Sequence, residues 1–216
     1  DNFLSIKKDV PTSVYDIAKA LMQSLKVVDP LTFYHCCRVG EYARRLARDS
    51  GLNEYEQKVA EFSGLFHDVG KIGIPQIVLH KPSKLDPEEY NFVQKHPEFS
   101  EQIVQVLSED PFFKDLLGPV RGHHERIDGS GYPDGLCGDQ IPLIARVILV
   151  VDTYDAMTQS RSYRKALSSE VAYVELSKFA GSQFDPQLVK IFLEAHPLWE
   201  NDYEPETKDK IIKHIA

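Results

Sequence analysis

The chain has 216 residues, of which 42% are hydrophobic and 27% are charged. This composition is typical of a globular protein with a sizeable core, so it excludes a disordered chain and leaves one domain as the simplest expectation. Lys and Arg number 25 against 33 Asp and Glu, and the net charge of −8 argues against binding to a nucleic-acid duplex, which needs a basic face. No apolar run approaches the ~18 residues of a membrane span, and no signal-peptide pattern opens the chain.

The cysteines and the first residue bear on where the chain works. The three cysteines, Cys36, Cys37 and Cys137, are an odd number, and two of them are adjacent. A disulfide framework is therefore not expected, and a reducing, cytoplasmic compartment fits better. The first residue is Asp1 rather than Met, so we expect a fragment or a processed chain with a regulatory domain on its N-terminal side.

Apolar residues at helical spacing predict helices along nearly the whole chain. The first covers residues 12–28, and the second covers about 32–50 with His35 on its buried stripe. Asn53 and Glu56 form a capping box that opens a third helix, which reaches His67.

Later segments also begin with helix-start signals. Asp86-Pro87 supplies an N-cap and a proline at the first position, and the helix it opens is expected to place Phe92 and His96 on one face. Residues 146–152 fit either a buried strand or a helix. Because no second strand candidate exists to pair with them, we interpret them as helix.

These patterns together predict an all-α fold. Residues 71–85 and 128–142 are rich in Gly and Pro and are expected to be irregular. We divide the chain into an N-terminal helix leading into the core (1–30), the core itself (31–195) and a polar C-terminal tail (196–216).

Residues with metal-ligand chemistry recur on or at the ends of the predicted helices. They are His35, His67, Asp68, His96, His123, His124 and Asp152. Imidazoles and carboxylates without thiolates suit Fe, Mn, Zn or Ni rather than Ca. Seven ligands are too many for one ion, whereas a carboxylate shared between two ions ~3.5–4 Å apart would distribute them sensibly. The alternative is that each His is an ordinary core or surface residue.

Two strings carry a family resemblance. Residues 67–75, HDVGKIGIP, resemble the metal motif of the HD superfamily of phosphohydrolases, and residues 123–133, HHERIDGSGYP, resemble the extended signature of its HD-GYP subfamily. Supporting matches follow at Lys81-Pro82, His96-Pro97, Gly135-Leu136, Ile141-Pro142, 152–158, 161–164 and 184–186. Members of this subfamily are bacterial phosphodiesterases that open the signalling dinucleotide cyclic di-GMP.

The resemblance implies a single HD-type helical bundle with a Gly- and Pro-rich GYP loop and a binuclear metal centre. One ion would be held by His35, His67, Asp68 and Asp152, and the other by His96, His123 and His124, with Asp68 bridging. A hydroxide between the ions would attack phosphorus and give linear pGpG, with GMP as a further product left open. Fe or Mn is expected ahead of Zn, Ni or Mg.

Further residues receive roles from the same resemblance. Lys71 would stabilise the transition state, and Asp155 would orient a ligand or accept the leaving-group proton; a solvated lysine is the alternative for Lys71. The substrate would contact the Gly131-Tyr132-Pro133 loop, Arg161 and Arg164. A loop-anchoring Tyr132 and surface ion pairs of the two arginines are the alternatives.

The chain departs from the family pattern at a few positions. Ser100 stands where Gly is usual, a small-for-small change that we expect to be tolerated. Leu31 replaces a Glu that some members carry, so we expect two metal ions rather than three. Thiolate ligation by Cys36 or Cys37 is conceivable, but helix geometry turns both away from the face of His35, so we expect them to pack in the core.

Other functions remain open from the sequence. They are a hydrolase of a mixed guanine–adenine cyclic dinucleotide, a general nucleotide phosphohydrolase, and a silent receptor that senses cyclic di-GMP or docks a diguanylate cyclase. The oligomeric state is also open.

Overall fold

Helices account for the fold of this protein, for which we analysed a computed structural model that describes residues 10, 12–160 and 165–199. The α-helices are α1 (Thr12–Val28), α2 (Pro30–Asp49), α3 (Glu54–Phe66), α4 (Gln76–Leu79), α5 (Pro87–Val93), α6 (His96–Gln105), α7 (Pro111–Gly122), α8 (Leu143–Thr158), α9 (Ser169–Lys178) and α10 (Pro186–Trp199), with 3-10 helices η1 (Val69–Gly73) and η2 (Gly138–Gln140). The described residues contain no strand, only an isolated bridge between Ala180 and Phe184. The all-α prediction is confirmed, and residues 146–152 lie in α8 as predicted.

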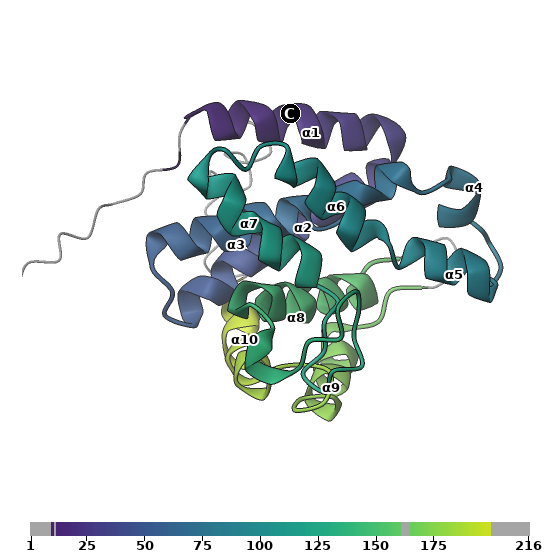
Figure 1. Ribbon diagram of the computed structural model, residues 1–216. Helices are drawn as coiled ribbons and strands as arrows, with labels where there is room; N and C mark the ends of the chain where they lie inside the picture. The colour runs from purple at the N-terminus through teal and green to yellow at the C-terminus, as the bar shows by residue number, and fades with distance from the viewer. Residues whose placement is uncertain (1–9, 11, 161–164, 200–216) are drawn as a thin grey trace, which may run out of the picture.

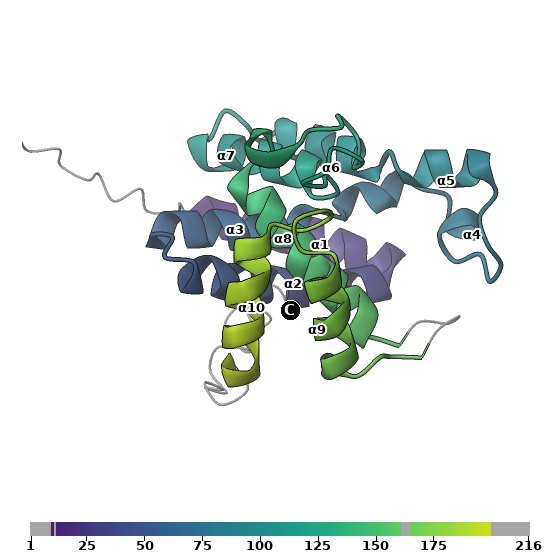
Figure 2. The ribbon, with the colours of Figure 1, turned by 90° about the horizontal axis from the view of Figure 1, so that it is seen from below.

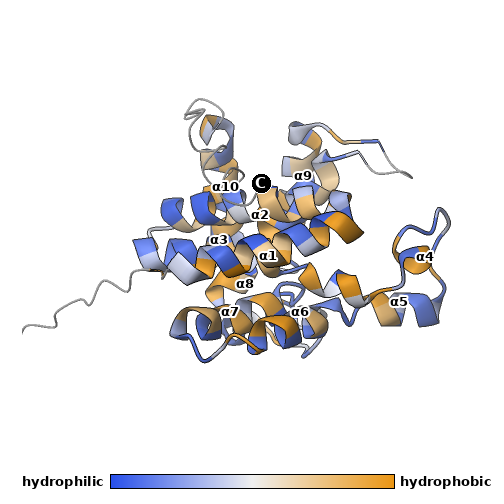
Figure 3. Cartoon of the chain, turned by 90° about the horizontal axis from the view of Figure 1, so that it is seen from above, coloured by the Kyte–Doolittle hydropathy of each residue, from blue (hydrophilic) through white to orange (hydrophobic). Residues whose placement is uncertain are grey.

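Helix α2 lies at the centre and separates two apolar clusters (Figure 1). Its residue Phe33 belongs to the cluster that also includes residues of α1, α3 and α7, whereas Val39 belongs to the cluster that includes residues of α8, α9 and α10. In Figure 3, hydrophilic and hydrophobic residues alternate along α1, as expected of a helix with one buried face. The centre of the molecule is therefore the place where both clusters meet α2.

Helices α2 and α3 approach closely enough for their backbones to touch. A Cβ added to Gly64 would lie 2.8 Å from the Cα of Gly40, closer than any side chain permits. This contact brings the C-terminal end of α3 against the N-terminal half of α2, where His35 is found.

The predicted helix-start signals at Asn53 and Asp86 are confirmed, but the helix that follows Asp86 is shorter than predicted. The capping boxes Asn53–Glu56 and Asp86–Glu89 both form. However, α5 ends at Val93 and a new helix begins at His96, so the prediction that Phe92 and His96 share one helix face is wrong. The cause is Pro97, which lacks an N–H and clashes with the preceding turn, so it is accommodated only in the first turn of a new helix.

Peripheral helices complete the structure. Helices α9 and α10 both pack against α8. Helices α4 and α5 project from one side of the bundle (Figure 2). None of the helices in the described ranges is long and apolar enough to cross a membrane. The division at residues 30 and 195 stays a prediction.

Candidate metal centre

The polar residues singled out by the sequence converge at one place inside the bundle. His35 comes from α2, His67 and Asp68 follow α3, His96 begins α6, His123 and His124 follow α7, and Asp152 comes from α8. All are buried except His124, which is partly buried. Five helices therefore contribute to the site, and most of its side chains lie at helix ends.

One group of donor atoms surrounds His35. Its Nε2 lies 3.0 Å from an oxygen of Asp152 and 3.7 Å from an oxygen of Asp68. The Nε2 of His67 lies 3.4 Å from the same Asp68 oxygen. Ligand atoms of His35, His67 and Asp152 all lie within 4.8 Å of one another, a spacing that would let one cation contact them together.

A second group faces the other oxygen of Asp68. The Nε2 of His96 lies 3.1 Å from Asp68 Oδ1 and 3.2 Å from the Nε2 atoms of His123 and His124. Asp68 therefore stands between the two groups, with one carboxylate oxygen toward each.

Hydrogen bonds behind the rings select which nitrogen faces the centre. The Nδ1 atoms of His67, His96 and His123 each lie 2.7–2.8 Å from the carbonyl oxygen three residues earlier. A carbonyl can only accept, so each Nδ1 carries the proton and each Nε2 presents a lone pair to the site. The i−3 spacing is available because each His stands at a helix end.

The donor set fits divalent cations. The Nε2 atoms of His96 and His123 are 3.2 Å apart, and each presents a lone pair to the other. The two lone pairs repel each other unless a cation binds both of them. The buried Nε2 of His67 and Oδ1 of Asp68 have no hydrogen-bond partner among the described residues. Because buried polar atoms are otherwise almost always satisfied, these atoms mark a place for a ligand.

Lowered pKa values keep the carboxylates of Asp68 and Asp152 ionised and the imidazoles of His123 and His124 neutral. Burial opposes the charged form of Asp68, but Lys71 and the neighbouring histidines outweigh it and hold its pKa well below the usual range. Burial, with the neighbouring His96, lowers the pKa of His124 to about 3. For His35, burial is outweighed by Asp152 and Asp155, which raise its pKa to about 9. A cation at His35 would therefore displace a proton.

Lys71 lies in η1, beyond the end of α3 at Phe66, and its Nζ contacts Asp68 Oδ2 at 2.5 Å. This contact puts its ammonium at the edge of the centre.

Asp155 and Arg38 support His35 from behind. Asp155 is 1% exposed and accepts from His35 Nδ1 at 2.7 Å and from Arg38 Nε and Nη2 at 2.6 and 2.9 Å. Sequence reasoning missed Arg38. Its position three residues after His35 puts it on nearly the same helix face, a signal that could have found it.

Ser100 joins the segments that carry His67 and His96. Its hydroxyl donates to the carbonyl of His67 at 2.7 Å and accepts from the backbone N–H of Gly70 at 2.8 Å. The expected tolerance of Ser at this position has a physical basis, because the hydroxyl satisfies two buried backbone groups.

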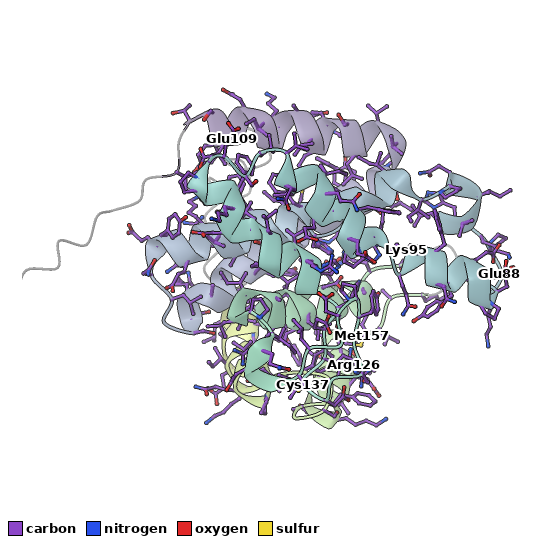
Figure 4. All side chains as sticks on the ribbon, in the orientation of Figure 1. Glu88, Lys95, Glu109, Arg126, Cys137 and Met157 are labelled. Carbon is purple, nitrogen blue, oxygen red and sulfur yellow. The ribbon has the colours of Figure 1, made fainter. Side chains whose placement is uncertain are left out.

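The segment from Arg126 to Pro142 follows the ligands His123 and His124 in the chain, and Figure 4 labels Arg126 and Cys137 on it. It carries Gly131, Tyr132 and Pro133, and the ring of Tyr132 lies 4.8 Å from that of His124. Sequence reasoning missed Glu125, whose buried carboxylate accepts three backbone N–H groups of this loop. The predicted substrate ligands Arg161 and Arg164 lie outside the described residues.

Cys36 packs in the core as the sequence predicted: it is fully buried in an apolar cluster. Its Sγ also lies within 4.8 Å of ligand atoms of His67 and Asp68. The helix-wheel argument considered only His35, whereas these two ligands come from the end of a neighbouring helix.

Comparison with known proteins agrees with this geometry. The family model described as HD domain matches residues 19–188, which is most of the chain. The chain belongs to the HD domain family. The HD superfamily is metal-dependent, and this HD domain holds His and Asp clusters that suit metal ions.

Relatives of this HD domain are named as phosphodiesterases. A 3'3'-cGAMP-specific phosphodiesterase of Vibrio cholerae is 36% identical over 184 residues, covering 83% of this chain and 42% of the relative. A cyclic di-GMP phosphodiesterase response regulator of Xanthomonas campestris is 39% identical over 156 residues. The match covers 72% of this chain and 41% of the relative. The chain thus spans about two-fifths of the length of these relatives.

The fold of this HD domain matches a solved structure. The crystal structure of a cyclic GMP-AMP-specific phosphodiesterase of Vibrio cholerae superposes with a TM-score of 0.64 at 19% identity. The match covers 92% of this chain and 53% of that one.

Proposed function

We propose that this HD domain is a metal-dependent phosphodiesterase that opens cyclic di-GMP to linear pGpG. The observation that carries the proposal is the inward-facing set of imidazole nitrogens and carboxylate oxygens around Asp68, next to the loop that carries Tyr132. Product analysis decides whether hydrolysis continues to GMP. The cytoplasmic location and a regulatory or diguanylate cyclase partner stay predictions.

Two cations are proposed for the centre. One would be held by His35, His67, Asp68 and Asp152, and the other by His96, His123, His124 and Asp68. Divalent cations there would supply Lewis acidity, since they lower the pKa of water and offset the charge of phosphate oxygens. Nitrogen and oxygen donors favour Fe or Mn.

The chain's own groups would position and polarise the substrate. The Lys71 ammonium, at 2.5 Å from Asp68, places positive charge where phosphate oxygens would approach. Tyr132 offers a ring face to a base. Both oxygens of Asp155 are engaged by Arg38 and His35, so we assign Asp155 the positioning of His35 rather than proton transfer.

The test is product analysis with the chain loaded with Mn²⁺ or, under anaerobic conditions, Fe²⁺. Cyclic di-GMP should be converted to pGpG, and Asp68→Ala should abolish turnover because both groups of donors lose their shared carboxylate. Asp16→Ala is the control, since that aspartate is exposed on α1 and outside both the centre and the loop that carries Tyr132. Wild-type turnover by Asp68→Ala would refute the proposed mechanism, and binding without turnover by the wild type would favour a receptor.

A second substrate has specific support. Relatives at 36% and 38% identity are named 3'3'-cGAMP-specific phosphodiesterases. We therefore propose to compare kcat/KM for cyclic di-GMP and 3'3'-cGAMP side by side. A higher kcat/KM for 3'3'-cGAMP would make 3'3'-cGAMP, rather than cyclic di-GMP, the preferred substrate. The proposed chemistry would stay the same.

A further inference from the structure

A sulfur atom lies beside the metal centre. Cys36 follows His35 on α2, is fully buried, and has its Sγ within 4.8 Å of ligand atoms of both His67 and Asp68. Three clusters of possible metal ligands occur among residues 10, 12–160 and 165–199, and this is the one that includes a cysteine.

The packing of α2 against α3 explains how both His35 and Cys36 reach the centre. Successive residues on a helix point about 100° apart, so His35 and Cys36 approach the centre from different sides of α2. His67 and Asp68, at the end of α3, lie close to both of them. His35 Nε2 is 3.7 Å from Asp68 Oδ2, and Cys36 Sγ is within 4.8 Å of ligand atoms of His67 and Asp68.

Two further atoms of this group lack partners. His67 Nε2 and Asp68 Oδ1 are buried and have no hydrogen-bond partner among the described residues. His67 Nδ1 is fixed by the Gly64 carbonyl, so the free Nε2 lone pair is aimed at the centre. The sulfur therefore lies beside donors that are already set to receive a cation.

The geometry points to Cys36 as a sulfur ligand of the cation that His67 and Asp68 hold, an inference that rests on the metal centre of the proposed function. When the cation binds, the thiol proton passes to solvent and the sulfur donates an electron pair to the metal. No redox change is involved.

A thiolate changes which metal the centre prefers. Soft sulfur ligands favour Fe²⁺, Co²⁺ or Zn²⁺, whereas an all-nitrogen and oxygen site accepts Mn²⁺ or Mg²⁺ more readily. Cys36 would therefore act as a determinant of metal selectivity. Of Fe and Mn, it favours Fe.

Cobalt substitution tests the inference without an activity assay. Co²⁺ bound to a thiolate gives a near-ultraviolet charge-transfer band that His and Asp ligands do not give. The double variant Cys37→Ser/Cys137→Ser keeps Cys36 as the one thiol and should retain the band of the wild type. Cys36→Ser should lose it while still binding Co²⁺ through the histidines.

X-ray absorption of the unsubstituted protein loaded with Zn²⁺ gives a second readout, which does not depend on a variant folding. A sulfur scatterer at ~2.3 Å, the usual Zn–S distance, is expected. The ratio of Zn²⁺ to Mn²⁺ affinity should fall at least about tenfold in Cys36→Ser, the lower end of what loss of an outer-shell partner costs.

Each result has a definite meaning. Bound Co²⁺ without the band, or a band unchanged in Cys36→Ser, overturns sulfur ligation and leaves the proposed metal centre intact. Failure of the wild type to bind Co²⁺, Zn²⁺ or Mn²⁺ overturns both the centre and this inference.

Discussion

Replacing Glu125 by Gln should loosen the loop that carries Tyr132. The carboxylate is 1% exposed; one oxygen accepts from the N–H groups of Asp134 and Gly135 at 2.7 and 3.2 Å, and the other accepts from Leu136 at 3.0 Å. A glutamine has one accepting oxygen, so its NH₂ group must face at least one N–H donor. The change keeps the shape of the side chain and removes at least one charge-assisted hydrogen bond.

The magnitude follows from that lost bond. A hydrogen bond to a charged group contributes roughly 1.5–3 kcal/mol, so the population of the open loop should rise about 10- to 150-fold. Trypsin cleavage after Arg126 reports that population when opening is fast relative to cleavage. The initial rate at this bond, followed by mass spectrometry, should therefore increase by the same factor.

A matched control separates this effect from a general loss of carboxylate charge. Glu56 also accepts a backbone N–H, that of Asn53 at 2.9 Å, but on the surface and far along the chain from the loop. Glu56→Gln should leave cleavage after Arg126 unchanged. If Glu125→Gln cleaves no faster than wild type, the loop is held by other contacts and the reasoning fails.

Three further outcomes are expected. Gly70→Ala would place a Cβ 2.2 Å from the carbonyl oxygen of His96. We expect the free energy of unfolding, measured in urea, to fall by ~1–3 kcal/mol, and the metal content, measured by elemental analysis, to be reduced. Lys71→Ala should lower kcat by about 10²-fold while the metal content is retained. Full activity of this variant would show that Lys71 is a solvated lysine without a catalytic role. Burial, with the charge of Arg45, lowers the pKa of His196 to about 4 from 6.5. The fold therefore favours neutral His196, so its contribution to stability is present above pH 6.5 and is lost as pH falls through 4. His196→Gln should flatten the pH dependence of the unfolding free energy in that window, and an unchanged slope would contradict the reasoning.

Local sequence determined the helices and the candidate ligands. Apolar spacing and capping boxes such as Asn53–Glu56 identified the helices because these signals act within a few residues of the chain. The residues with ligand chemistry were visible for the same reason, since His67-Asp68 and His123-His124 occur in short strings. The break before His96 was misjudged although its cause, Pro97, is itself local.

Tertiary structure decided how those residues work together. The pairing of Arg38 with Asp155 joins positions 117 residues apart, and the reach of Cys36 to His67 depends on how closely α2 and α3 approach. No helix-wheel or motif argument contains such distances, because they depend on the packing of several helices at once. The sequence therefore specified which atoms are available as ligands, and the packing of helix ends around Asp68 specified which of them can meet at one cation.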